Sequence, residues 1–239
     1  MWSHPSSIAI RSAVNLARDV AAWVAGRFAR VRASRRGWAI PLLLVIAACD
    51  APRLTPLSAD GAILAFGDSL TYGTGAATKQ SYPTVLAELT GRPVINAGVP
   101  GEISATGANR LPEVLAQHAP ELLVLIHGGN DTLRNLRPDD TRANLKRMIE
   151  TSRESGAQVV LLAVPGRNLT LSAPAYYEEV AEELDVPIDS SVLPRLMRDR
   201  AMKSDPVHFN AEGYRRLAQG VYELLQDEGA LKHGAFSDS

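Results

Sequence analysis

Apolar residues in this chain are grouped in two ways, as short runs and as stripes of helical spacing. The mainly apolar runs predict strands at 62–66, 93–96, 122–126, 159–164 and 186–189. The run at 122–126 has no polar residue, which is typical of a strand buried on both faces of a sheet. Apolar stripes predict helices at 81–89, 107–118, 138–154, 174–184 and from 210 onwards. Strands that alternate with helices predict an α/β domain, in which a parallel sheet of about five strands lies between helices.

Capping residues mark the ends of two of these helices. Asn210 is a favourable N-cap, and the helix after it carries Tyr214, Leu217 and Val221 on one face. The helix at 138–154 is followed by a serine and a glycine at 155–156, a sequence that stops helices. These boundaries support the helical prediction at both places.

Composition excludes several classes of function. The chain has 239 residues and a net charge of −1, but residues 1–48 contain seven arginines and one acid, so that 49–239 carry 18 basic and 25 acidic residues. An acidic body of this kind is not expected to bind nucleic acid, whose phosphates need a basic surface. The single cysteine, Cys49, excludes an internal disulfide and a zinc site built from cysteines.

The beginning of the chain predicts export and lipid attachment. An apolar run at 38–48 follows Arg35 and Arg36; it is shorter than a membrane span but suits the apolar region of a signal peptide. It ends in Ile-Ala-Ala-Cys49, which resembles a bacterial lipobox, where cleavage before the cysteine is coupled to its acylation. The alternatives are an ordinary secretory signal or an uncleaved anchor. The motif predicts a lipoprotein that is anchored in the bacterial cell envelope and faces the periplasm.

These features divide the chain into four parts. We predict an N-terminal extension with the signal peptide at 1–48, a Pro-rich tether at 49–60, the α/β domain at 61–230 and a short tail at 231–239. Apolar residues at 10–31 also follow a helical stripe between arginines. That segment is either a basic amphipathic helix at a membrane surface or upstream sequence that belongs to a wrongly chosen start.

Polar residues follow the ends of three predicted strands, and their chemistry suits hydrolysis. Ser69, Gly101 and Asn130 each come shortly after a strand, and in parallel sheets ligands gather at the carboxyl ends of the strands. A serine hydroxyl becomes a nucleophile when a histidine held by a carboxylate takes its proton. His208 and Asp205 suit these roles because their spacing lets one turn direct both side chains to the same place. The backbone N–H groups of Ser69 and Gly101 and the Asn130 side-chain amide are candidate donors to an oxyanion.

The sequence resembles the SGNH (GDSL) hydrolase family in four blocks. They are Gly67-Asp68-Ser69-Leu70, the segment 96–101, Gly128-Gly129-Asn130-Asp131 and Asp205-Pro206-Val207-His208. The similarity covers residues 62–228 and is closest to the small bacterial acyl-thioesterase, arylesterase and lysophospholipase branch. It implies a three-layer α/β/α flavodoxin-like fold, no cofactor and no metal. It also implies a Ser69–His208–Asp205 triad and an oxyanion hole made by Ser69, Gly101 and Asn130.

Several neighbours of these residues have two interpretations. Gly98 competes with Gly101 for the second oxyanion donor, and we choose Gly101 because it precedes an acidic residue, as in the family. The branch usually has Glu-Leu where this chain has Ile126-His127. We expect His127 to be a satisfied core histidine, with a substrate contact as the alternative. Asp131 is expected to be structural.

The leading functional hypothesis is a serine esterase that acts on a small-molecule or lipid ester, including thioesters or lysophospholipids. One alternative is an O-acetyl esterase that acts on a cell-envelope glycan. Another is a non-catalytic, lipid-anchored binding protein, and a third is a flavodoxin-type module that binds FMN. The complete set of site residues favours the esterase over the binding protein, because a decayed site usually lacks a member.

Overall fold

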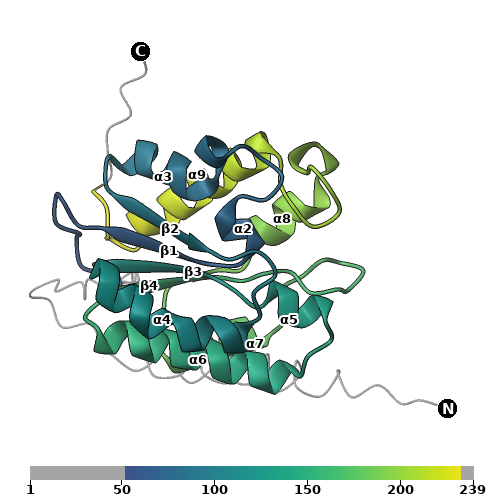
Figure 1. Ribbon diagram of the computed structural model, residues 1–239, viewed down its shortest axis with the longest axis horizontal. Helices are drawn as coiled ribbons and strands as arrows, with labels where there is room; N and C mark the ends of the chain where they lie inside the picture. Colours follow the sequence, from purple (N-terminus) through teal and green to yellow (C-terminus); the bar gives the residue numbers. More distant parts are fainter. Residues whose placement is uncertain (1–51, 233–239) are drawn as a thin grey trace, which may run out of the picture. The chain divides into compact units, whose positions relative to one another are not determined.

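Five parallel strands form a single sheet in the computed structural model, which describes residues 52–232 (Figure 1). The strands are β1 (Ile63–Gly67), β2 (Val94–Gly98), β3 (Leu122–Ile126), β4 (Gln158–Leu162) and β5 (Ile188–Asp189). Their order is β2-β1-β3-β4-β5, and each neighbouring pair is parallel. The predicted α/β fold with about five strands is therefore confirmed.

Helices cover both faces of this sheet. They are α2 (Ser69–Tyr72), α3 (Tyr82–Thr90), α4 (Ser104–His118), α5 (Gly129–Leu133), α6 (Pro138–Glu154), α7 (Tyr176–Glu183), α8 (Val192–Arg198) and α9 (Ala211–Asp227). Two short 3-10 helices are η1 (Thr78–Gln80) and η2 (Arg200–Met202). In Figure 1, α3, α8 and α9 lie on one face of the sheet and α4, α6 and α7 on the other. Every residue of β1 and β3 is buried between these layers, as the unbroken apolar runs predict.

The three shortest α-helices in this part of the chain, α2, α5 and α8, are absent from the sequence prediction. Each has four to seven residues, so none is long enough to show two turns of an apolar stripe. Two of them, α2 and α5, begin at or next to the candidate residues Ser69 and Asn130. The undetected elements are therefore those that direct the chain at the carboxyl edge of the sheet.

Part of the predicted tether packs against the domain. Leu54 and Leu57 are buried, and their N–H groups donate to the carbonyls of Glu228 and Ala230 at 3.0 and 2.9 Å. The Pro-rich composition indicated a tether, but two leucines give this segment an apolar face that the body covers. The chain from residue 52 is therefore attached beyond the carboxyl end of α9.

The predicted signal peptide, the stripe at 10–31 and Cys49 lie outside the described residues. Between 52 and 232, no helix combines the length and the apolar composition needed to cross a bilayer.

Candidate active site

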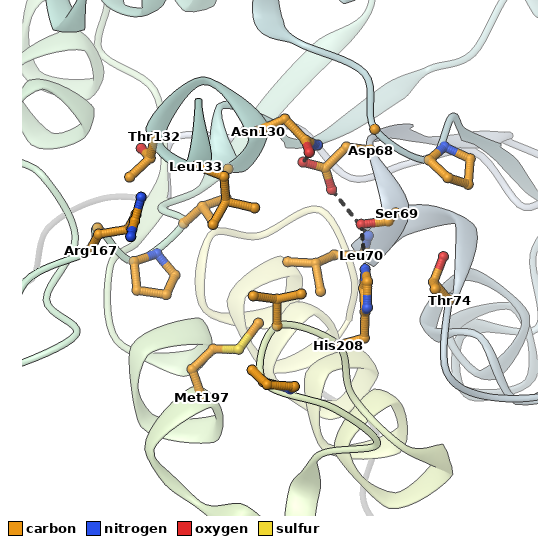
Figure 2. Close-up of a pocket in the computed structure, with 18 of the residues that line it drawn as sticks. Asp68, Ser69, Leu70, Thr74, Asn130, Thr132, Leu133, Arg167, Met197 and His208 are labelled. Carbon is orange, nitrogen blue, oxygen red and sulfur yellow. Dashed lines mark hydrogen bonds between the residues drawn. The ribbon is translucent and has the colours of Figure 1, made fainter. Parts of the chain in front are cut away.

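The sheet order brings the three strand-end residues to one place. Ser69 follows β1, Gly101 follows β2 and Asn130 follows β3, and β1 lies between the other two strands. All three residues line one cavity of about 330 Å³, to which the loop before α9 adds His208 (Figure 2). Residues separated by up to 139 positions thus meet at the carboxyl edge of the sheet.

Two glycines allow neighbouring backbone segments to approach closely around Ser69. A Cβ on Gly67 would lie 2.0 Å from the Ile126 carbonyl oxygen, and one on Gly98 would lie 2.1 Å from the Tyr72 nitrogen. Strands β1 and β2 can therefore approach β3 and α2 only without side chains at these positions. This close packing accounts for the presence of glycine at position 98.

His208 connects the nucleophile candidate to the acid candidate. The Ser69 hydroxyl lies 2.9 Å from His208 Nε2, and His208 Nδ1 lies 2.7 Å from Asp205 Oδ2. A carboxylate can only accept hydrogen bonds, so Nδ1 carries the proton that faces Asp205. Nε2 is then left as the acceptor for the serine O–H. This is the arrangement in which a serine can transfer its proton to a neutral imidazole.

The turn that carries Asp205 and His208 is fixed by its own hydrogen bonds. Asp205 Oδ1 accepts the backbone N–H groups of Val207 and His208 at 2.8 and 2.9 Å. Burial alone would raise the pKa of Asp205, but hydrogen bonds from the His208 ring and these two N–H groups outweigh it and hold the pKa below the usual 3.8. Asp205 is therefore a carboxylate at neutral pH.

A second hydrogen bond joins the two sides of the site. The Tyr214 hydroxyl, on the buried face of α9, donates to the Thr74 carbonyl oxygen at 2.7 Å. Thr74 lies just beyond the short helix that begins with Ser69. This contact holds the first turn of α9, and with it the His208 loop, next to the nucleophile candidate.

The candidate oxyanion donors differ in their availability. Within the described residues, no acceptor takes the N–H of Ser69 or Gly101, whereas the Gly98 N–H donates to Asn96 Oδ1 at 3.0 Å. The competing candidate Gly98 is thus occupied, and Gly101 faces the cavity. One N–H of the Asn130 amide donates to Asp68 Oδ2 at 3.0 Å, which leaves its second N–H.

Asp131 supports the segment around Gly101. Its carboxylate is buried and accepts the N–H and the hydroxyl of Ser104 at 2.8 and 2.5 Å, together with the Thr141 hydroxyl at 3.3 Å. From the other side, Arg134 donates to the Gly101 carbonyl oxygen at 2.8 Å. These contacts agree with the structural role expected for Asp131.

His127 is a satisfied core histidine, as predicted. Its side chain is fully buried, Nδ1 accepts the Gly128 N–H at 3.0 Å, and Nε2 lies 3.3 Å from Glu102 Oε2. Arg110 binds both oxygens of Glu102, at 2.9 and 2.8 Å, and its guanidinium stacks over the Phe66 ring at 4.3 Å. Within the described chain His127 therefore has partners on both ring nitrogens and does not line the cavity.

The wall of the cavity is mostly apolar. Its larger apolar side chains are Leu70, Leu133, Val164, Leu171, Met197 and Val207. Figure 2 shows Met197, Leu133 and Arg167 away from the Ser69–His208 pair. Leu171 lines the cavity, whereas Leu169 is fully exposed and the buried Tyr177 hydroxyl donates to the His127 carbonyl oxygen.

Sequence reasoning missed Met197 and gave no role to Asp68. Met197 belongs to a short helix with no detectable period. Asp68 was visible as part of the first block, but an acid before a short helix is most simply interpreted as a cap. Among residues 52–232, no group of three or more His, Cys, Asp or Glu side chains is placed to hold a metal ion.

Comparisons with known proteins agree on one family. Residues 65–216 match the GDSL-like lipase/acylhydrolase family model. The chain is 30% identical to an arylesterase of Vibrio mimicus over 68% of this chain and 87% of that protein. It is 28% identical to thioesterase 1/protease 1/lysophospholipase L1 of Escherichia coli K12, over 69% and 83%. The crystal structure of TesA superposes with a TM-score of 0.62 at 28% identity and covers 70% of this chain and 99% of that chain.

The buried Glu102 generates a prediction for stability. Burial alone would raise its pKa, but hydrogen bonds from His127 and Arg110 outweigh this and hold the pKa below the usual 4.5. The ionised form therefore stabilises the fold above pH 4.5, and this contribution is lost as the pH falls through the lower folded-state pKa. Glu102→Gln should lower the free energy of unfolding at pH 7 by up to about 3 kcal/mol.

Urea unfolding at pH 7 and at pH 4 or below measures this effect, and the difference from wild type should shrink in acid. Glu212→Gln is the matched control, because Glu212 also has two basic partners, Arg215 and Arg216, but lies at the surface. Glu212→Gln should lower the free energy of unfolding much less than Glu102→Gln does. Equal effects of the two substitutions would show that Glu102 is not a structural anchor.

Proposed function

This chain belongs to the GDSL-like lipase/acylhydrolase family and is a carboxylic ester hydrolase, and we propose that it works through an acyl-enzyme on Ser69. The observation that supports this most directly is the His208 ring. It lies within hydrogen-bond distance of the Ser69 hydroxyl on one side and of the Asp205 carboxylate on the other. An imidazole in this position accepts a proton from serine and is stabilised as it becomes charged.

The proposed reaction has two halves. Ser69 Oγ attacks the carbonyl carbon of the ester while its proton moves to His208 Nε2, and the carbonyl oxygen becomes an oxyanion. The Ser69 and Gly101 N–H groups and the Asn130 amide donate to that oxygen. When the intermediate collapses, the alcohol or thiol leaves with the proton from Nε2. A water molecule then repeats the sequence on the acyl-enzyme, which releases the acid and restores Ser69.

Kinetics of single and double variants test this scheme. Ser69→Ala and His208→Ala should each lower kcat by about 10⁴-fold or more, and the double variant should be no slower than either one, because the two residues act as a unit. Asp205→Ala should lower kcat by a smaller factor, since the His208 imidazole remains. Hydrolysis of p-nitrophenyl butyrate measures kcat, and thermal unfolding shows that the variants are folded. Near wild-type turnover in a folded His208→Ala variant would remove His208 from the scheme.

The cavity favours an acyl chain longer than the acetyl group of an acetylated glycan. Its wall is largely aliphatic and includes Leu133 and Met197, which lie apart from Ser69 (Figure 2). Its volume of about 330 Å³ lies at the lower end of the usual range for ligand pockets. We therefore propose esters or thioesters with short to medium acyl chains as substrates, and lysophospholipids among them.

A series of p-nitrophenyl esters from acetate to octanoate tests this preference. Each methylene buried in the cavity should raise kcat/KM about fourfold until the cavity is full, since burial of one methylene contributes roughly 0.8 kcal/mol. Leu133→Asp should reduce turnover of the longer esters more than turnover of acetate. Leu136→Asp is the control, because Leu136 is similarly exposed but does not line the cavity. A series in which acetate is the best substrate would favour the O-acetyl esterase instead.

We also propose that the enzyme is a lipoprotein anchored in the cell envelope through acylation of Cys49. The lipobox-like sequence at this single cysteine supports the proposal. Acyl chains bind a bilayer with about 0.8 kcal/mol per buried methylene, so two or more chains hold a protein firmly.

Cys49→Ser should move the protein from the membrane fraction to the soluble fraction of expressing cells, with esterase activity retained. Immunoblots of the two fractions measure this shift. Retention of Cys49→Ser protein in the membrane would contradict the anchor.

A further inference from the structure

The buried carboxylate of Asp68 connects two elements of the candidate site. It is 2% exposed and lies directly before Ser69 in the chain. Oδ1 accepts the Leu70 N–H at 3.1 Å, and Oδ2 accepts the Asn130 side-chain N–H at 3.0 Å. Figure 2 shows the Asp68 and Asn130 side chains together on one side of Ser69, with the His208 ring on the other. Asp68 thus contacts the residue that follows the nucleophile and the amide that follows β3.

An asparagine amide works as an oxyanion donor only in one of its two orientations. The NH₂ group has two N–H bonds, and the carbonyl oxygen at the other end of the amide has none. Rotation of the amide by half a turn would present oxygen to the oxyanion. Because a carboxylate accepts but does not donate, it pairs favourably with the NH₂ end and repels the oxygen end.

We propose that Asp68 is a positioning residue, which fixes the Asn130 amide so that its second N–H points to the oxyanion hole. This inference rests on the proposed acyl-enzyme reaction and adds a residue with no assigned role in it. The two hydrogens of Nδ2 then have separate uses. One is held by Asp68 throughout, and the other is left for the charge that develops on the substrate.

The choice of an acid at position 68 supports this role over simple capping. Serine, asparagine and threonine also cap helices, and they carry no charge to bury. Burial raises the pKa of Asp68, so the ionised form is disfavoured at this place. A neutral asparagine at 68 would satisfy the Leu70 N–H but would offer the Asn130 amide both a donor and an acceptor. Only the carboxylate selects one orientation.

Asp68 has two other effects on the site, and each of them would also lower kcat when Asp68 is replaced. As the cap of α2 it helps to place Ser69, and as an anion it attracts the imidazolium that forms on His208. Neither effect acts through Asn130. A double-mutant cycle, which measures the coupling between positions 68 and 130, therefore separates the positioning of the Asn130 amide from both of these effects.

The cycle compares wild type, Asp68→Ala, Asn130→Ala and the double variant with p-nitrophenyl butyrate. Asn130→Ala should lower kcat by about 10²–10³-fold, the usual effect of losing one oxyanion donor. Asp68→Ala should lower kcat by roughly 10–100-fold with little change in KM, because the affected contact forms in the transition state. In the Asn130→Ala background, the same substitution should lower kcat less than about threefold. Asp68→Asn, which keeps the shape, should lie between wild type and Asp68→Ala.

Asp189→Ala is the matched control. The Asp189 carboxylate likewise accepts backbone N–H groups at the start of a short helix, those of Ser191 and Val192 at 2.6 and 2.7 Å, but it does not line the cavity. Its kcat should equal that of wild type. Thermal unfolding of each variant shows whether it is folded. If Asp68→Ala lowers kcat by the same factor in both backgrounds, Asp68 does not act through Asn130 and the proposal is overturned.

Nuclear magnetic resonance of the Asn130 side-chain amide gives a readout that needs no turnover. In ¹⁵N-labelled protein, the pair of signals that Asn130→Ala removes belongs to this amide. Asp68→Ala should shift these two signals and speed their exchange with water, while Asp189→Ala should leave them in place. Unchanged signals in folded Asp68→Ala protein would overturn the positioning role. If the wild-type protein hydrolysed no ester, the proposed function would fail, and this measurement would still decide whether Asp68 holds Asn130.

Discussion

The hydrogen bond between the Ser69 hydroxyl and His208 Nε2 is the interaction on which the proposed chemistry depends. Sheet topology makes it available. The order β2-β1-β3 reverses direction at β1, and such switch points leave a crevice outside the carboxyl ends of the strands. Ser69 lies in that crevice because β1 ends there. The loop before α9 crosses the same edge and brings His208, and Tyr214 ties the helix behind it to Thr74.

Three buried carboxylates support this edge of the sheet, each through different partners. Asp131 accepts hydrogen bonds from Ser104 and so fixes the chain after Gly101. Glu102, which follows Gly101 in the chain, pairs with His127 and Arg110. Asp68 contacts Asn130 directly. Burying charge is costly unless each charge is paired or hydrogen-bonded, and all three are. Hydrogen-bonded carboxylates beside a largely apolar cavity suit an enzyme that must hold donors in fixed orientations.

Sequence reasoning predicted the sheet and the longer helices well, because burial on both faces and helical period leave clear patterns. The strand at 122–126 and the helix at 138–154 are found within the same bounds. The candidate residues could be proposed because four short motifs follow strand ends or precede a capped helix. The helices α2, α5 and α8 could not be predicted, because they are too short to show a helical period of apolar residues. Partners such as Glu102 for His127, 25 positions apart, depend on tertiary contacts that no local pattern encodes. The leucines at 54 and 57 were visible, but their burial depends on the end of a distant helix.

The most direct test of the central claim is the site of reaction with a fluorophosphonate, which forms a covalent bond with an activated serine and releases fluoride. Intact mass and peptide mapping should find one adduct, on Ser69. It should be absent from Ser69→Ala protein and should form much more slowly in His208→Ala protein. An adduct on another residue, or labelling of Ser69 at the wild-type rate without His208, would contradict the claim that His208 activates this serine.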